Sequence, residues 1–223
     1  MITVHHLNNS RSQRILWLLE ELNLPYEIKK YERHPKTMLA PPELTKIHPL
    51  GKSPVITDGS ITVAESGAII EYLVNKYGNG RLKPSNHSAQ EIRYNYWLHY
   101  AEGSFMFPLV LSLIFGSLPK QPAPFFIKPI LKMISKKFMS SYVGPQINLH
   151  VDYLEAELQN STWFAGEEFT AADIQLSFPI EAASARDGFA QNKPKLKAYL
   201  DRIHSRIAYK KALEKGGTFE ILR

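Results

Sequence analysis

Strand-like patterning in this 223-residue chain is confined to residues before 65, and everything after them has helical patterning or turn signals. Residues 2–7 and 26–31 are short segments that predict strands, and residues 10–22 between them predict a helix with its leucines on one face. A strand, a helix and a second strand in this order predict a right-handed parallel crossover. The chain therefore begins with an α/β unit.

A hairpin and a second helix complete this first unit. Two short apolar runs, residues 55–57 and 61–64, flank Asp58-Gly59, a dipeptide typical of tight hairpin turns. Residues 66–77 then have helical spacing. Four strands with both parallel and antiparallel neighbours predict a mixed sheet.

The remainder of the chain predicts an all-α domain. Gly78, Asn79 and Gly80 end the helix, and residues 84–88 have the composition of a linker. We expect domains at 1–79 and 88–223. The segments with helical patterning are 89–113, a helix opened by Pro145, 171–186, 194–206 and 208–215, and a proline-broken insertion spans 119–129.

Composition removes several classes of chemistry. The chain has no cysteine, which excludes disulfides, thiolate zinc sites, iron–sulfur clusters and a cysteine nucleophile. Its eight histidines show no metal-binding spacing, so we expect neither a metal nor a resident cofactor.

The first residues lack a signal-peptide pattern. The longest apolar stretch, residues 105–118, contains Pro108 and is shorter than the roughly 20 residues of a membrane span. We therefore expect a cytoplasmic protein without membrane attachment.

The net charge of +6 needs no nucleic-acid partner. Lys128, Lys132 and Lys136 recur every four residues, so they share one helix face, which we interpret as a solvated surface. No RNA-binding motif accompanies them, and we expect no nucleic-acid binding. A basic protein does favour small anionic substrates.

Hydroxyl side chains stand at two predicted helix starts. Ser10 follows the first strand and has Gln13 three residues later, which predicts a capping box. The same position can hold an anion at the positive end of a helix. Glu65-Ser66 is open to two interpretations as well: a helix cap, or a carboxylate and a hydroxyl that together hold an amino-acid head group.

Two further motifs have structural interpretations. Thr170 and Asp173 form a second capping box, which we expect to fix a buried helix start. Ser53-Pro54 precedes the third strand, and an X–Pro bond is cis in only about 5–6% of cases. A cis bond would expose the Ser53 backbone to pair with a peptide ligand.

The order of these motifs resembles the cytosolic glutathione S-transferase family from end to end. It runs from Ser10-x-x-x-Arg14 through a loop ending in Ser53-Pro54 to the hairpin, Glu65-Ser66 and a late capping box. The resemblance is nearest to serine-type members, the theta class and its fungal and bacterial relatives. It implies a thioredoxin-like N-terminal domain, an all-helical C-terminal domain, a homodimer and an active site in the cleft between domains.

The resemblance also implies roles for single residues. Ser10 would donate a hydrogen bond to the glutathione sulfur, with Asn9 and Ser12 as alternatives near the same helix start. Glu102 would reach the glutathione of the partner subunit. The positions implied to bind glutathione are Lys52, which faces the glycyl carboxylate, Ser53 before a cis Pro54, and Glu65 and Ser66 at the γ-glutamyl end.

The implied reaction is attack of the glutathione thiolate on a hydrophobic electrophile. A free thiol with a pKa of about 8.5 is only roughly 3% ionised at pH 7. A hydrogen bond to a charged acceptor contributes about 1.5–3 kcal/mol, and a helix end adds roughly 0.3–1. These terms suffice to lower the thiol pKa by about two units, which requires roughly 2.7 kcal/mol. Ionisation of the glutathione thiol beside Ser10 therefore needs no general base.

Aromatic residues of the helical domain are candidates for the electrophile site, because such sites are apolar. They are Phe105, Phe107 and Phe126, for which a core or dimer contact is an equal interpretation. Peroxidase activity stays open, since a thiolate also attacks oxygen. The alternative to an enzyme is a non-catalytic module of the same fold used for protein interaction or regulation.

Overall fold

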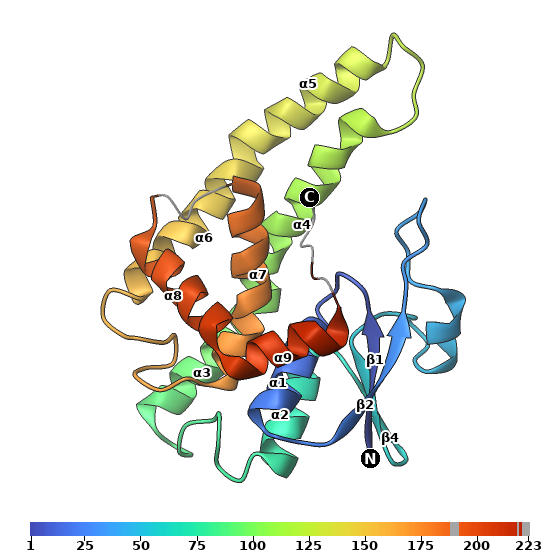
Figure 1. The fold of residues 1–223 in the computed structure, drawn as a ribbon. Helices are drawn as coiled ribbons and strands as arrows, with labels where there is room; N and C mark the ends of the chain where they lie inside the picture. Colours follow the sequence, from blue (N-terminus) through green and yellow to red (C-terminus); the bar gives the residue numbers. More distant parts are fainter. Residues whose placement is uncertain (188–191, 218, 220–223) are drawn as a thin grey trace.

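A computed structural model of the chain describes residues 1–187, 192–217 and 219 (Figure 1). Its N-terminal part is a four-stranded sheet in the order β2-β1-β3-β4. The strands are β1 (Ile2–Leu7), β2 (Tyr26–Tyr31), β3 (Val55–Asp58) and β4 (Ile61–Ala64). The first two run parallel, and β3 is antiparallel to both β1 and β4. The predicted mixed sheet and its crossover are confirmed.

Alternation along β1 separates two packing faces. Ile2 and Val4 face α1 (Gln13–Glu21) and α2 (Ser66–Tyr77), and they belong to the main core. On the opposite face, Leu7 packs with Tyr31 and with Leu44 of the 3-10 helix η1 (Pro42–Lys46). The third position on the helix-facing side is occupied by His6, which is only 4% exposed. A polar ring buried in this row needs hydrogen-bond partners.

The start of α1 differs from the prediction. The helix begins at Gln13, and the expected capping box between Ser10 and Gln13 is wrong. The backbone has a positive φ of 48° at Asn9 and then turns through Ser12. The Ser10 hydroxyl oxygen consequently accepts a hydrogen bond from the Ser12 N–H (3.2 Å) instead of capping the helix.

The rest of the chain is helical. Beyond Ala64 the described residues contain no strand apart from a single bridge between Trp163 and Gly166. The segments are α3 (Ala89–Tyr100), η2 (Ala101–Phe105), α4 (Met106–Ser117), η3 (Leu118–Lys120), α5 (Lys128–Phe138), η4 (Met139–Val143), α6 (Gly144–Glu157), α7 (Ala171–Asp187), α8 (Pro194–Ser205) and α9 (Ile207–Gly216).

Two prolines lie inside long helical runs. Pro108 is in α4 and Pro145 is in α6, and each follows a π turn, η2 or η4. A proline ring meets the carbonyl group four residues earlier in a regular helix. In both runs that carbonyl belongs to a π turn, where the hydrogen bonds span five residues and the spacing is wider. Pro145 lies in the first turn of α6, so the predicted helix opening there is confirmed, and the helix predicted over residues 89–113 continues through Pro108.

Because Pro108 does not interrupt it, Ala89–Lys120 forms one run of 32 residues with a window of mean hydropathy 1.5. By length and composition alone this run could cross a membrane, although core helices of soluble proteins meet the same criteria. This helical run is thus longer than the helix predicted over residues 89–113. Its first part, α3, packs in the core through Tyr94 and Trp97, whereas 28% of the most apolar window is buried.

The long helices α4 and α5 form a hairpin that projects away from the sheet (Figure 1). Phe115 and Phe138 stack within it at 4.7 Å between ring centroids. The Ser135 hydroxyl donates to the Phe115 carbonyl oxygen at 2.8 Å. Lys128, Lys132 and Lys136 are exposed on α5, as expected for a solvated face.

The helices of the two parts meet along α1, α7 and α9. Arg206 forms a bidentate ion pair with Glu21 of α1 at 2.5 and 2.8 Å.

One half of the predicted capping box at α7 is confirmed, because the carboxylate of the buried Asp173 accepts a hydrogen bond from the Thr170 N–H at 2.9 Å. Asp173 also accepts from the Phe164 N–H at 3.1 Å, so it ties the preceding loop to the helix. Burial raises the pKa of Asp173 to about 6 in spite of these bonds.

Candidate functional site

Ser10 lies in the turn between β1 and α1, and it is 4% exposed. Its hydroxyl oxygen is 2.7 Å from the hydroxyl oxygen of Ser12 and also accepts from the Ser12 N–H. Ser12 itself is fully buried. Two groups of one neighbour therefore fix the position of the Ser10 oxygen, at the N-terminal end of α1 where an anion is stabilised.

One turn further along α1, Arg14 joins three parts of the chain. Its guanidinium donates to the Ser66 hydroxyl (3.0 Å), the Glu102 carboxylate (2.6 Å) and the Gln175 carbonyl oxygen (2.5 Å). The side chain is 2% exposed. Arg14 thus connects the start of α2 with η2 and α7, across the boundary between the sheet and the helical part.

Glu102 receives a second arginine. Arg11 donates to its other carboxylate oxygen at 2.6 Å. Burial raises the pKa of Glu102, but the charges of Arg14 and Arg11 and their hydrogen bonds outweigh burial and leave the pKa below its usual value. The carboxylate is therefore ionised at neutral pH, and both of its oxygens are occupied by arginines of its own chain. A contact from Glu102 to a partner subunit's glutathione stays a prediction.

Glu65 and Ser66 begin α2. Glu65 is exposed and adopts φ 69° and ψ 127°, a conformation that a non-glycine residue rarely takes. Such backbone geometry costs roughly 1–3 kcal/mol and occurs preferentially at functional sites. Ser66 is buried, with its hydroxyl held by Arg14. The acidic side chain therefore stays in solvent beside a fixed hydroxyl.

The loop before β3 holds the remaining predicted glutathione residues. The Ser53–Pro54 peptide bond is cis, as the family resemblance implies. The Ser53 hydroxyl donates to the His5 carbonyl oxygen of β1 at 2.9 Å, which fixes this loop to the sheet, and Lys52 is exposed. The binding roles of these residues stay predictions.

The three aromatic candidates for an electrophile site lie in different surroundings. Phe105 is fully buried in the main core beside Tyr100, so the interpretation as a core residue is correct for Phe105. Phe107 is 56% exposed near the start of α4. Phe126 is 61% exposed in the connection at the far end of the α4–α5 hairpin. The structure does not gather these three rings in one place.

Sequence analysis missed His6 and Arg11. The His6 Nδ1 lies 2.9 Å from the Ser12 hydroxyl, and its Nε2 lies 3.1 Å from the Gly216 carbonyl oxygen. The alternation of Ile2, Val4 and His6 on one face of β1 was a signal that this ring is buried. Nothing local marks Arg11, because its partner Glu102 is 91 residues away.

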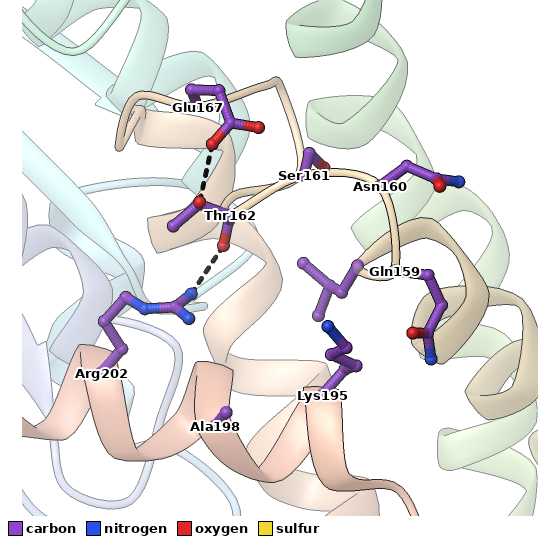
Figure 2. Close-up of a pocket in the computed structure, with 9 residues that line it drawn as sticks. Gln159, Asn160, Ser161, Thr162, Glu167, Lys195, Ala198 and Arg202 are labelled. Atoms are coloured by element: carbon purple, nitrogen blue, oxygen red, sulfur yellow. Dashed lines mark hydrogen bonds between the residues drawn. The ribbon is translucent and has the colours of Figure 1, made fainter.

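Two cavities lie away from Ser10. One of about 300 Å³ is lined by the end of α6, the following loop and α8, including Lys195 and Arg202 (Figure 2). There the Arg202 guanidinium donates to the Thr162 carbonyl oxygen at 2.6 Å. The other, of about 720 Å³, is lined by residues 80–90 and 165–170. Neither is lined by a predicted site residue, and no group of metal-binding side chains occurs in the described part of the chain.

Comparison with known proteins agrees with this architecture. Residues 1–75 match the family model of the glutathione S-transferase N-terminal domain, and residues 123–206 match that of the C-terminal domain. The chain is 42% identical over 217 residues to glutathione S-transferase 3 of Schizosaccharomyces pombe, covering 96% of this chain and 88% of the relative.

Solved structures show the same fold. A crystal structure of a glutathione S-transferase from Actinobacillus pleuropneumoniae has a TM-score of 0.83 and 36% identity, covering 100% of this chain and 96% of that one. A glutathione transferase of Phanerochaete chrysosporium, solved with oxidized glutathione, has a TM-score of 0.76 and 19% identity, covering 96% and 94%. The chain belongs to the glutathione S-transferase family, and its N-terminal domain is thioredoxin-like.

Proposed function

We propose that this enzyme of the glutathione S-transferase family transfers the glutathione thiolate to hydrophobic electrophiles, with Ser10 as the hydrogen-bond donor to sulfur. The observation that supports this role is the Ser10 hydroxyl oxygen, held at the start of α1 by the Ser12 N–H and hydroxyl. A donor fixed before the substrate arrives needs no reorganisation when charge develops on sulfur. The serine-type assignment is part of the proposal.

The glutathione molecule would lie along the N-terminal domain. Glu65, exposed at the start of α2, would take the γ-glutamyl ammonium, and the Ser66 hydroxyl and neighbouring amides would take the carboxylate. The Ser53 backbone, beside the cis bond, would pair with the cysteinyl unit, and Lys52 would face the glycyl carboxylate. This orientation brings the sulfur toward Ser10.

The reaction then depends on ionisation of the thiol. The Ser10 O–H donates to the sulfur, and the helix end adds a favourable field, so the thiolate dominates at neutral pH. The thiolate attacks the electrophilic carbon, a sulfur–carbon bond forms, and the leaving group departs with its electron pair. Phe107, exposed on α4, supports an apolar electrophile position. The same thiolate could reduce a peroxide.

We also propose a cytoplasmic homodimer with a role in detoxification, free of membrane and nucleic acid and without a resident cofactor. Support for the dimer comes from large apolar side chains that the hairpin exposes, such as Leu113 and Met133. A soluble monomer rarely exposes a contiguous apolar patch of several hundred Å². Sedimentation equilibrium of the full chain tests the dimer, and a single species of 25.4 kDa would contradict it.

Turnover of Ser10→Ala tests the catalytic proposal. Loss of the donor is expected to lower turnover at saturating glutathione and neutral pH by roughly 10–100-fold. A turnover equal to that of the wild type would remove Ser10 from the mechanism. If the wild type binds glutathione without activating its thiol, the non-catalytic alternative is correct.

A further inference from the structure

Ser10 is the first member of a buried chain of hydrogen bonds that ends at α9. The chain runs from the Ser10 hydroxyl to the Ser12 hydroxyl (2.7 Å), then to the His6 Nδ1 (2.9 Å), and from the His6 Nε2 to the Gly216 carbonyl oxygen (3.1 Å). Both serines and His6 are at most 4% exposed. These contacts therefore form without competition from bulk solvent.

The direction of this chain follows from its last acceptor. A carbonyl oxygen can only accept, so the His6 Nε2 carries a hydrogen. Burial lowers the pKa of His6 to about 4, with a smaller contribution from the charge of Lys30, so the ring is neutral at pH 7 and its Nδ1 is a bare acceptor. The Ser12 hydroxyl then donates to the His6 Nδ1. Its other acceptor, the Leu7 carbonyl oxygen, is farther away at 3.3 Å.

This direction distinguishes the two serines. The hydrogen of Ser12 is committed to His6, and its oxygen is left to accept from Ser10. The hydrogen of Ser10 can turn about its own C–O bond toward a ligand, while the Ser12 N–H keeps the Ser10 oxygen in place. Ser10 is therefore the hydroxyl that is able to donate outward, and Ser12 holds it.

The far end of the chain is fixed by close packing. A Cβ atom at Gly216 would lie 2.6 Å from the Gln13 Oε1 and 2.8 Å from the Leu16 Cδ1, so a larger residue here would have to displace these two side chains of α1. That approach brings the Gly216 carbonyl to the His6 ring. The position of the Ser10 hydroxyl thus depends on how α9 packs against α1 and His6.

We infer that Ser12 and His6 are positioning residues for the thiol-activating hydroxyl of Ser10, an inference that rests on the proposed function. The Ser12 N–H holds the Ser10 oxygen, and the bond from the Ser12 hydroxyl to the His6 Nδ1 fixes Ser12, and with it that N–H, against β1. Neither side chain contacts glutathione. Their loss should weaken thiol activation while glutathione binding, which depends on β3 and the start of α2, changes little.

The test is the pKa of enzyme-bound glutathione thiol, followed by thiolate absorbance in ultraviolet difference spectra against pH. Ser12→Ala keeps the backbone N–H that holds the Ser10 oxygen but loses the bond to His6 that fixes it. The variant is expected to raise that thiol pKa by roughly 0.5–1 and to lower turnover by roughly 3–10-fold, with the KM for glutathione changed less than twofold. His6→Phe, which removes the acceptor, should behave like Ser12→Ala. His6→Asn offers an amide oxygen near the Nδ1 position and should restore a wild-type thiol pKa.

Controls separate this inference from the proposed function. Ser135→Ala, which removes a buried hydroxyl in the distant α5, should leave the thiol pKa unchanged. If Ser10→Ala raises the thiol pKa and Ser12→Ala does not, the positioning role is refuted and the role of Ser10 stands. If Ser10→Ala itself leaves the thiol pKa unchanged, the proposed function of Ser10 fails first. Circular dichroism of each variant shows whether a loss reflects unfolding.

Discussion

Replacing Glu102 by Gln should destabilise the fold through Arg14. The substitution removes a negative charge 2.6 Å from a guanidinium that is 2% exposed. Leaving a fully buried charge without its partner costs about 3–5 kcal/mol. Because the Glu102 side chain is 27% exposed and Gln keeps one acceptor oxygen, we expect roughly 2–3 kcal/mol, between the buried and surface limits. The melting temperature should fall by roughly 5–10 °C.

The second arginine on the same carboxylate provides a matched control. Arg11 is 39% exposed, so Arg11→Gln should cost only about 0–1 kcal/mol. Urea unfolding of wild type, Glu102→Gln and Arg11→Gln gives these free energies directly. Equal losses in the two variants, both below about 0.5 kcal/mol, would refute the reasoning that burial of Arg14 makes the pair important.

Acid pH should reduce the difference between wild type and Glu102→Gln. Because the folded-state pKa of Glu102 is lowered, the carboxylate contributes stability above its unfolded pKa of about 4.3, and this contribution is lost as the pH falls through the folded pKa. The two proteins should therefore differ most above pH about 5 and converge in more acidic solution. A difference that stays constant from pH 7 to pH 3 would show that charge is not the cause.

Two further variants test single elements of the account. Asp173→Ala leaves the Phe164 and Thr170 N–H groups buried without an acceptor, which should cost roughly 2–6 kcal/mol in urea unfolding; a loss below about 1 kcal/mol would show that the capping box is dispensable. Glu65→Gly removes the side chain proposed to bind the γ-glutamyl ammonium but suits the φ of 69°, so the KM for glutathione should rise without a fall in melting temperature. A lower melting temperature with an unchanged KM would contradict both parts of that expectation.

Local patterns in the sequence were sufficient for the fold class and for most elements of the sheet. The alternation in β2, the turn at Asp58-Gly59 and the helical spacing of residues 66–77 each depend on near neighbours, and the structure has them at those places. The two π turns were not predictable, because the prolines that follow them ordinarily end a helix. The proline-broken segment predicted at 119–129 covers the connection between α4 and α5.

The candidate site was less predictable because its contacts join distant segments. Ser10 and Ser66 were marked by their places at helix starts, whereas the arginines that bind Glu102 come from α1 and the turn before it, about 90 residues earlier. The role of Ser10 as a helix cap was wrong, since the chain turns once more before α1 begins. His6 has its partner Gly216 210 residues away, so no local pattern could indicate that contact.

The most direct test of the central claim is the pKa of the glutathione thiol bound to the wild-type enzyme. Thiolate absorbance in the ultraviolet difference spectrum should appear with a midpoint near pH 6–7, roughly two units below the free thiol at about 8.5. In Ser10→Ala the midpoint should return toward the value of the free thiol. A wild-type midpoint near 8.5, or a midpoint that Ser10→Ala leaves unchanged, would contradict thiol activation by Ser10.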